Sequence, residues 1–273
     1  MLNSPPMLNG SDALRTTLTI AGSDSSGGAG IQADIKTFTA LGTYGMSVLT
    51  AVTAQNTFSV EKVLEVPCDM VIAQLEAVYS DINIHALKTG MLVNKEIIEA
   101  ISSFIANKEL TNVVIDPVML STSNRELLQP QAVDTLINKL VPLSTVITPN
   151  IPEAEKLCGM SINSEIDIKE AARRIHAKGT GFVLIKGGHL EGDAVDILYD
   201  GRNYSAYRSP RIGATEIHGT GCTLSAAITA FLARGEGVED AVAKAKEYIN
   251  EAILHSFLPG HGARCLYHAV TRV

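Results

Sequence analysis

The stretch His218-Gly219-Thr220-Gly221-Cys222-Thr223 decides how the chain is interpreted, because it leads directly into an apolar helical segment. From Leu224 to Leu232 large apolar residues recur at i, i+4, i+7 and i+8, the spacing of one buried helical face. The two glycines let the backbone turn tightly, and the helix dipole adds about half a positive charge at the same place. The stretch therefore predicts a helix whose start binds anions. Cys222 falls in its first turn, where a thiol pKa can fall and the thiolate can act as a base or a nucleophile.

Three interpretations of this turn stay open. One is a cradle for a phosphate, since unpaired N–H groups at a helix start attract anions. The second is a plain glycine-rich connection from a strand to a helix. The third is the thiol pair of a hydrolase, with Cys222 as nucleophile beside His218. The chain contains no GxxxxGK[ST] sequence, so a Walker-type nucleotide site is excluded.

Strands and helices are expected to alternate along the rest of the chain. The strands are indicated by β-branched and apolar runs, which we interpret as buried, and the helices by apolar residues at helical spacing. The expected strands cover residues 16–21, 47–55, 59–66, 85–89, 113–116, 145–148 and 182–186, with a hairpin of 194–199 and 204–208 around Asp200-Gly201. The expected helices cover residues 31–41, 70–79, 95–105, 132–140, 168–178 and 238–254. This order predicts an α/β fold, a mainly parallel sheet with helices on both faces.

Polar clusters follow several of these strands. They are the Gly22–Gly30 loop, Gln55-Asn56, Lys88-Thr89-Gly90, Asp116-Pro117, Thr148-Pro149-Asn150 and Lys186-Gly187-Gly188. Ligands of parallel sheets bind beyond the carboxyl ends of the strands. We therefore expect the clusters to converge on one cleft together with Gly219–Cys222.

The Gly22–Gly30 loop formally contains GxGxxA, from Gly28 to Ala33. The first glycine comes too long after the strand, and no acidic residue ends the second strand, so we do not interpret it as a dinucleotide fingerprint. The functional interpretation is a loop that lets a small planar substrate approach the backbone, with Asp24 and Asp34 as polar candidates. The alternative is a linker without a role.

Three further positions carry candidate chemistry. Asn150 and Glu153 have the spacing of a helix-capping pair, and the same two side chains could orient Mg²⁺ through its waters. Lys186 ends an apolar strand before two glycines, where a cation could reach phosphate oxygens. Asp116 ends another strand before a proline, and turn initiation is its alternative.

Composition limits the partners and the compartment. The 273 residues are 46% hydrophobic with a net charge of −7 and no basic block, which argues against nucleic acid and anionic membranes as partners. No apolar stretch approaches the ~18 residues of a membrane span. The four cysteines are scattered, which favours a reducing, cytoplasmic setting. Residues 1–14 lack the features of a secretory signal and are expected to be a disordered extension, with one domain over 15–273.

Several segments carry a resemblance to a known family. They are TIAGSDSSGGAGIQADIKTF (19–38), YGMSVLTAVTAQNT (44–57), KTGML (88–92), VVIDPVM (113–119), VITPNIPEAE (146–155), KGGH (186–189) and HGTGCTLSAAI (218–228). In this order they resemble the hydroxymethylpyrimidine/phosphomethylpyrimidine kinases of thiamine biosynthesis, within the ribokinase-like superfamily and close to bacterial pyridoxal kinases. The resemblance implies a three-layer α/β/α fold, use of ATP and Mg²⁺, and a homodimer.

The resemblance also implies roles for individual residues. Gly219, Thr220 and Gly221 would form an anion hole for the transferred phosphoryl group. Cys222 would be the catalytic base, with Asp116 as a supporting group.

Two further sets of residues would bind the substrates. Gln55 would recognise the aminopyrimidine ring, a role that suits a carboxamide because it both donates and accepts hydrogen bonds. The same pocket would be lined by Gly22, Asp34, Met91 and Val118. The Mg–ATP phosphate region would consist of Asn150, Glu153 and Lys186, with Mg²⁺ held indirectly through Glu153.

The function implied is ATP-dependent phosphorylation of 4-amino-5-hydroxymethyl-2-methylpyrimidine and then of its monophosphate. Gln55-Asn56-Thr57 resembles the pyrimidine kinases more than the pyridoxal kinases. A pyridoxal or pyridoxine kinase of vitamin B6 salvage, alone or as a second activity, is the alternative. A non-catalytic protein that binds such a vitamer is a further one.

Overall fold

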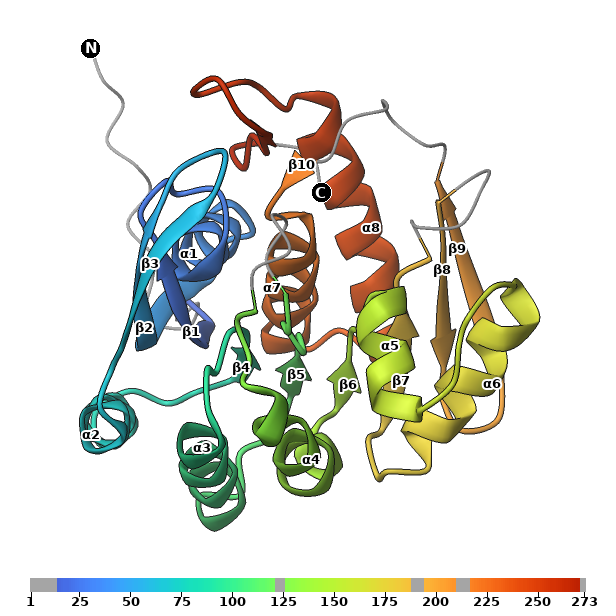
Figure 1. Ribbon diagram of the computed structural model, residues 1–273, viewed down its shortest axis with the longest axis horizontal. Helices are drawn as coiled ribbons and strands as arrows, with labels where there is room; N and C mark the ends of the chain where they lie inside the picture. The colour runs from blue at the N-terminus through green and yellow to red at the C-terminus, as the bar shows by residue number, and fades with distance from the viewer. Residues whose placement is uncertain (1–13, 121–125, 188–193, 210–216, 271–273) are drawn as a thin grey trace.

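The central feature of the fold is a nine-stranded sheet in the order β3-β2-β1-β4-β5-β6-β7-β8-β9 (Figure 1). The computed structural model describes residues 14–120, 126–187, 194–209 and 217–270. From β2 to β7 neighbouring strands are parallel, and β3, β8 and β9 extend the two edges in antiparallel pairing. The strands are β1 (Thr16–Asp24), β2 (Tyr44–Gln55), β3 (Val60–Glu65), β4 (Ala86–Thr89), β5 (Val113–Ile115), β6 (Val146–Ile147), β7 (Phe182–Ile185), β8 (Ala194–Tyr199) and β9 (Tyr204–Ser209).

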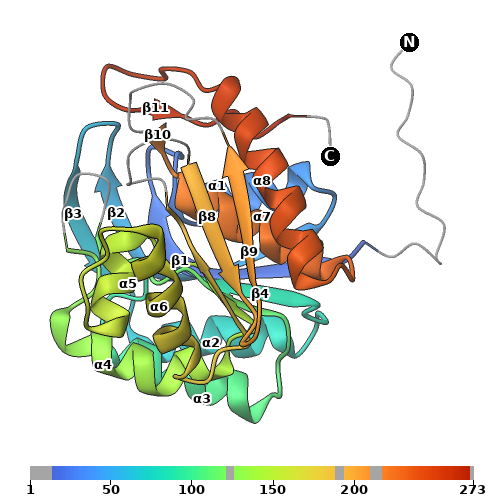
Figure 2. The same ribbon diagram turned by 90° about the vertical axis from the view of Figure 1, so that its right-hand side faces the viewer.

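Helices cover both faces of the sheet, so the fold has three layers (Figure 1, Figure 2). One face carries α1 (Gly30–Ala40), α7 (Thr220–Ala233) and α8 (Val238–Leu254). The other face carries α2 (Cys68–Tyr79), α3 (Lys95–Asn107), α4 (Val133–Thr135), α5 (Ile151–Cys158) and α6 (Glu165–His176). The predicted α/β/α architecture with a mainly parallel sheet is confirmed.

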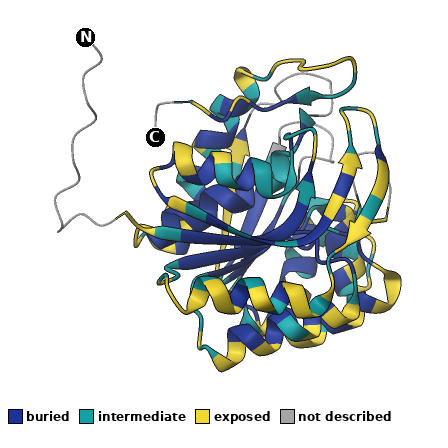
Figure 3. Ribbon diagram, turned by 90° about the vertical axis from the view of Figure 1, so that its left-hand side faces the viewer, coloured by how far each residue is buried: buried dark blue, intermediate teal, exposed yellow. Residues whose placement is uncertain are grey.

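The sheet is buried because each face has its own apolar layer (Figure 3). Successive side chains of a strand point to opposite faces. Leu87 and Ile115 accordingly pack with the layer of α2 to α6, while Ala86, Val114 and Leu184 pack under α7 and α8. A parallel sheet buried on both faces is the structure expected of near-continuous apolar strands.

The same alternation places charged side chains beneath α7. Lys88, Asp116 and Lys186 each lie two residues after a side chain of the α7 face, namely Ala86, Val114 and Leu184. Lys88 lies one residue before the end of β4, and Asp116 and Lys186 directly follow β5 and β7, all at the same edge of the sheet. The carboxyl edge therefore carries a row of charges on the α7 side.

A short ladder connects the chain's C-terminal region to the stretch before α7. Strand β11 (Arg264–Cys265) pairs in parallel with β10 (Ile217–His218). Just before β11, the N–H of Ala263 donates to the carbonyl oxygen of Thr57 at 2.8 Å, and the N–H of Gly262 donates to Thr57 Oγ1 at 3.1 Å. This C-terminal segment therefore ties the turn after β2 to the stretch that leads into α7.

Two expected elements differ from the structure. The helix expected over 132–140 is broken into a 3₁₀ turn (Pro130–Ala132), α4, a π-helical turn (Leu136–Leu140) and a 3₁₀ turn (Val141–Leu143). Pro142 has no N–H to continue an α-helical ladder. The third strand is a mostly exposed edge strand rather than a buried one, because β3 lies at the end of the strand order, next to β2.

The expected N-terminal extension lies outside the described residues, apart from Leu14. The single domain over 15–273 stays a prediction. In the ranges that the structure describes, no helix is both long and apolar enough to cross a membrane.

Candidate active site

Two glycine turns meet at the carboxyl edge of the sheet. Gly219 has φ +84°, and a Cβ atom there would lie 1.8 Å from the carbonyl oxygen of Gly28. A Cβ atom at Gly28 would in turn lie 2.4 Å from Cδ2 of His218. Only glycine fits at position 219, because the close atom is a backbone oxygen and the conformation is left-handed, whereas a Cβ atom at position 28 would displace the His218 ring. The predicted convergence of the Gly22–Gly30 loop with Gly219–Cys222 is thus observed.

Asp24 holds the first of these turns together. Its carboxylate accepts hydrogen bonds from the N–H groups of Ser26, Gly28 and Ala29, and Nε2 of His218 lies 2.9 Å from Oδ2. Burial opposes ionisation, but the hydrogen bonds from His218 and Ser26 lower the pKa of Asp24 below its usual value. Asp24 therefore acts as a structural anchor of the loop, and its oxygens are already occupied.

Cys222 is half-buried in the first turn of α7. Burial is the main cause that raises the pKa of its thiol to about 12; Lys88 acts in the opposite direction, and Asp116 and Asp34 act in the same direction as burial. The expectation that a helix start lowers this pKa is therefore wrong for the free protein, since the loss of hydration outweighs the favourable charges. At neutral pH Cys222 carries its proton.

Asp116 and Lys186 form an ion pair against the same turn. Nζ of Lys186 donates to Oδ1 of Asp116 at 3.1 Å, and Oγ of Ser225 donates to Oδ2 at 3.2 Å. A Cβ atom at Gly221 would lie 3.2 Å from Nζ of Lys186, so the ammonium touches the turn itself. Burial would raise the pKa of Asp116, but Lys186 and Lys88 hold it below its usual value. The structure thus joins three of the residues that the resemblance assigned to phosphoryl transfer.

Asn150 and Glu153 form the capping pair that their spacing predicted. The side chain of Asn150 accepts from the N–H of Glu153 at 2.9 Å, and Oε2 of Glu153 accepts from the N–H of Asn150 at 2.8 Å. Glu153 is only 6% exposed, and burial raises its pKa to about 7 although Lys186 acts in the opposite direction. The capping interpretation is confirmed, and the magnesium interpretation stays a prediction.

Asp34 is fully buried between α1 and the sheet. Both its side chain and that of Lys88 are fully buried, with Oδ1 of Asp34 2.9 Å from Nζ of Lys88. Oδ2 accepts from Oγ1 of Thr19 at 2.6 Å. α1 presents the residue to the sheet, and the expectation that Asp34 lines the substrate pocket stays a prediction. The sequence pattern placed Lys88 among the polar clusters after the strands and indicated no role for it. Its position two residues after Ala86 places it on the buried face of β4 that packs against α7.

The remaining pocket residues lie around β1 and β2. Nε2 of Gln55 lies 3.2 Å from Nε2 of His218, and Oγ1 of Thr53 donates to Oε1 of Gln55 at 3.2 Å. A Cβ atom at Gly22 would lie 2.9 Å from Sδ of Met91, so these two are in contact across β1 and β4. Val118 is half-buried after β5 and donates its N–H to the carbonyl oxygen of Asp116.

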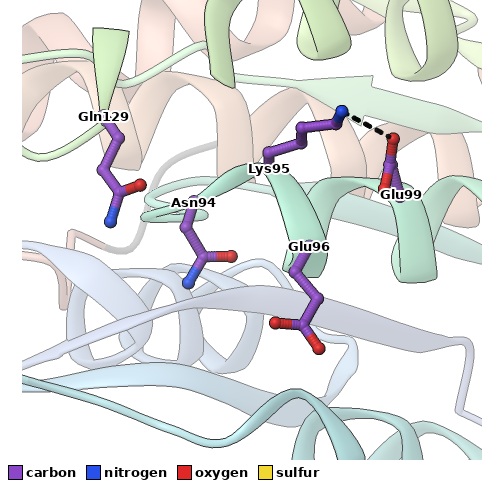
Figure 4. Close-up of a pocket in the computed structure, with 5 residues that line it drawn as sticks. All are labelled: Asn94, Lys95, Glu96, Glu99 and Gln129. Atoms are coloured by element: carbon purple, nitrogen blue, oxygen red, sulfur yellow. Dashed lines mark ion pairs between the residues drawn. The ribbon is translucent and has the colours of Figure 1, made fainter. Parts of the chain in front are cut away.

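The residues present fit a magnesium ion that keeps water ligands between itself and the protein. They do not fit an ion that side chains alone would enclose. Across the described residues, no group of three or more His, Cys, Asp or Glu side chains could enclose a metal. Asp116 and Glu153 both face Lys186 and supply the carboxylate oxygens that Mg²⁺ prefers. A separate hollow at the start of α3 contains none of the predicted site residues (Figure 4); its lining consists of Asn94, Lys95, Glu96, Glu99 and Gln129.

A three-layer fold with a glycine turn, a helix start and a Lys–Asp ion pair at one edge of the sheet defines a phosphotransferase of the ribokinase-like class. The sequence profile of the phosphomethylpyrimidine kinase family matches residues 24–266. The chain belongs to that family.

Individual relatives agree with this assignment. The hydroxymethylpyrimidine/phosphomethylpyrimidine kinase of Haemophilus influenzae is 48% identical over 255 residues, which cover 91% of this chain and 94% of the relative. The thiamine biosynthesis bifunctional protein ThiED of Geobacter sulfurreducens is 51% identical over 87% of this chain, and the match spans about half of that longer protein, 49%. Among solved structures, the ADP complex of Bacillus subtilis pyridoxal kinase is 44% identical with a TM-score of 0.88, covering 94% of this chain and 98% of that one.

Proposed function

We propose that this kinase transfers the γ-phosphoryl group of ATP to 4-amino-5-hydroxymethyl-2-methylpyrimidine and then to its monophosphate, which gives the diphosphate used in thiamine biosynthesis. The observation that carries the proposal is the Lys186–Asp116 pair in contact with the Gly219–Cys222 turn at the start of α7. A cation, free N–H groups and a helix start gathered at one point suit a transferring phosphoryl group.

The turn would hold the phosphoryl oxygens. The first N–H groups of α7 have no partner within the helix, and Gly219 is the residue that precedes them. Their donors, together with the ammonium of Lys186, would stabilise charge on the phosphoryl group as the bond to ADP breaks. Positioning and charge neutralisation of this kind supply most of the catalysis in phosphoryl transfer. Mg²⁺ supplies further neutralisation of phosphate charge when bound, and Asp116 and Glu153 would hold it through its waters.

Cys222 would accept the proton of the hydroxymethyl group. The oxygen of that group forms its bond to phosphorus while its O–H bond breaks, so the proton needs an acceptor at the first turn of α7. The thiol must first ionise, since burial raises its pKa to about 12. In a loose transition state the hydroxyl proton is transferred late, so the base has a smaller share in catalysis than positioning and charge neutralisation. The raised pKa also disfavours the hydrolase interpretation, which needs a ready thiolate at neutral pH.

The pyrimidine would lie between Gln55 and the Gly22–Met91 contact. The carboxamide of Gln55 is half-buried and held from two sides by Thr53 and His218. Such a preorganised amide can pair with the ring amine and a ring nitrogen of an aminopyrimidine. The alternative substrate is pyridoxal. The observation that supports this alternative is the TM-score of 0.88 to the solved structure of a pyridoxal kinase.

Two properties of the assembly belong to the same proposal. We propose a homodimer, in keeping with the family resemblance, and light scattering of the purified protein would test it. We also propose a cytoplasmic location, because four unpaired cysteines suit a reducing compartment.

The decisive experiment measures ADP release with Mg–ATP and one of three acceptors: hydroxymethylpyrimidine, its monophosphate or pyridoxal. Turnover of the two pyrimidines with weak turnover of pyridoxal is expected. Pyridoxal as the better substrate would replace the proposal by a vitamin B6 kinase. Binding of the pyrimidine without ADP release would instead indicate a vitamer-binding protein.

A further inference from the structure

Lys88 is a fully buried cation in a protein whose proposed chemistry does not yet use it. Its side chain is 0% exposed, and so is that of Asp34, its partner in the ion pair. An ammonium has three N–H donors. Within the described part of the chain, the structure gives this ammonium one hydrogen bond, to Oδ1 of Asp34. The remaining donors and the positive charge lie inside the protein.

The position of Lys88 directs that charge toward the active site. Lys88 follows Ala86 on the face of β4 against which α7 packs. A Cβ atom at Gly90 would lie 3.7 Å from Nζ of Lys88, so the ammonium lies next to the strand end that leads to Met91. The helices α1 and α7 both begin at this edge, and α7 carries Cys222 in its first turn.

Stability alone is a weak explanation for such a pair. The desolvation of two charges offsets most of their attraction, and replacing a buried ion pair by apolar side chains is often neutral or stabilising. A buried ammonium beside the active site has an effect that an apolar side chain would lack, namely a field that favours negative charge nearby.

We propose that Lys88 is a positioning residue that acts through Cys222: its buried ammonium, held under α7 by Asp34, stabilises the Cys222 sulfur as a thiolate. The catalytic meaning rests on the proposed function, whereas the effect on the thiol can be measured without any substrate. The charged groups that act on Cys222 are Lys88 from β4, Asp34 from α1, Asp116 after β5 and Lys186 after β7. Of these, Lys88 has the largest influence and favours ionisation, and Asp34 opposes it.

The test is alkylation of Cys222 by iodoacetamide, followed by mass spectrometry of each cysteine, from about pH 8 to about pH 10, where only the thiolate reacts. Lys88→Met should slow the reaction of Cys222 by about tenfold at each pH, the effect of one pKa unit. Asp34→Asn should accelerate it, because the carboxylate that opposes ionisation of the thiol is removed while Asp116 still favours the charged form of Lys88. Cys158, on the opposite face of the sheet, serves as an internal control with an unchanged rate.

Lys88→Met and Asp34→Asn break the same ion pair. If the pair had a purely structural role, both substitutions would change the alkylation rate of Cys222 in the same direction. Opposite directions support the proposal, and equal directions overturn it. Because Lys88→Met leaves a buried carboxylate unpaired and can impair folding, the double variant Lys88→Met with Asp34→Asn is measured as well. The proposal predicts that Cys222 of the double variant is alkylated more slowly than in the wild type, but less slowly than in a folded Lys88→Met variant. An unchanged rate in the double variant overturns the proposal. A kinase that fails on all pyrimidines leaves these thiol measurements unaffected.

Discussion

Nζ of Lys186 lies 3.1 Å from Oδ1 of Asp116 and joins two strand ends that are 70 residues apart in the sequence. The carboxylate is 2% exposed, and Ser225 of α7 donates to its other oxygen. One contact therefore links β5, β7 and α7 at the place where the phosphoryl group is proposed to bind.

Replacing Lys186 by Met is expected to lower kcat by about 10²- to 10³-fold, the usual effect of removing one group that stabilises transition-state charge. It also leaves Asp116 buried without its cation, so the protein should be less stable. The matched control is the double variant Lys186→Met with Asp116→Asn, which should regain thermal stability but not turnover. Full activity in either variant would contradict the proposed role of Lys186.

Replacing Cys222 by Ala is expected to lower turnover sharply while the melting temperature stays close to that of the wild type, because removal of the small thiol leaves no charge unpaired. Cys158→Ala, at a half-buried cysteine away from the site, should leave turnover unchanged. Near-normal turnover in a folded Cys222 variant would remove this residue as the base.

The pH dependence of turnover follows from the raised pKa of Cys222. With a thiol pKa of about 12, the thiolate fraction grows tenfold per pH unit across the neutral and mildly alkaline range. Turnover limited by proton transfer should therefore rise with pH and show no plateau near neutrality. A pH-independent rate in this range would indicate that Cys222 does not ionise in the rate-limiting step.

Gly219→Ala is expected to destabilise the protein and abolish activity, since the added Cβ would lie 1.8 Å from the carbonyl oxygen of Gly28. Gly235 provides the matched control, because it also has a positive φ, +92°, but nothing within 4 Å of the added atom. Gly235→Ala should cost only about 1–2 kcal/mol of backbone strain. Comparing the free energies of unfolding of the two variants separates the close contact from the strained conformation.

Glu153 should make the protein less stable as the pH rises from about 4.5 to about 7. Its folded pKa of about 7 lies above the ordinary value of 4.5, so the folded state binds more protons in this window and stability falls by up to about 1.4 kcal/mol per pH unit. His268 acts in the opposite sense, because burial lowers its pKa from 6.5 to about 4. Subtracting the unfolding curves of Glu153→Gln from those of the wild type isolates the contribution of Glu153. A difference that does not change with pH would contradict the raised pKa.

Gln55→Ala is expected to raise KM for hydroxymethylpyrimidine by about tenfold or more, the effect of losing hydrogen bonds to a bound polar ring. The KM for ATP should change little, since the phosphates of the nucleotide are proposed to bind at Lys186 and Glu153 and not at Gln55. Steady-state kinetics with each substrate varied in turn distinguishes the two. An equal rise in both would place Gln55 outside the pyrimidine pocket.

Local patterns were sufficient to predict much of the fold. The helix Val238–Leu254 has its predicted bounds, and the hairpin of β8 and β9 turns at Asp200-Gly201 as expected. The capping pair of Asn150 and Glu153 was also predicted correctly. Each of these depends on residues that are close in the sequence.

The features that the sequence did not predict depend on distant residues. The burial of Asp34 depends on Lys88, which lies 54 residues further along the chain. The pKa of Cys222 depends on how completely α1, β4 and α7 exclude water, and no short sequence pattern contains that information. The edge position of β3 likewise follows from the strand order and not from its own apolar residues.

The ladder between β10 and β11 has a consequence for the order in which the protein matures during synthesis. All nine strands of the main sheet precede residue 210, whereas the contacts of Gly262 and Ala263 with Thr57 and the pairing of Cys265 with His218 come from the final part of the described chain. A nascent chain can therefore complete its sheet while the turn after β2 and the approach to α7 are still untethered. Catalytic competence should appear only when these late residues have left the ribosome.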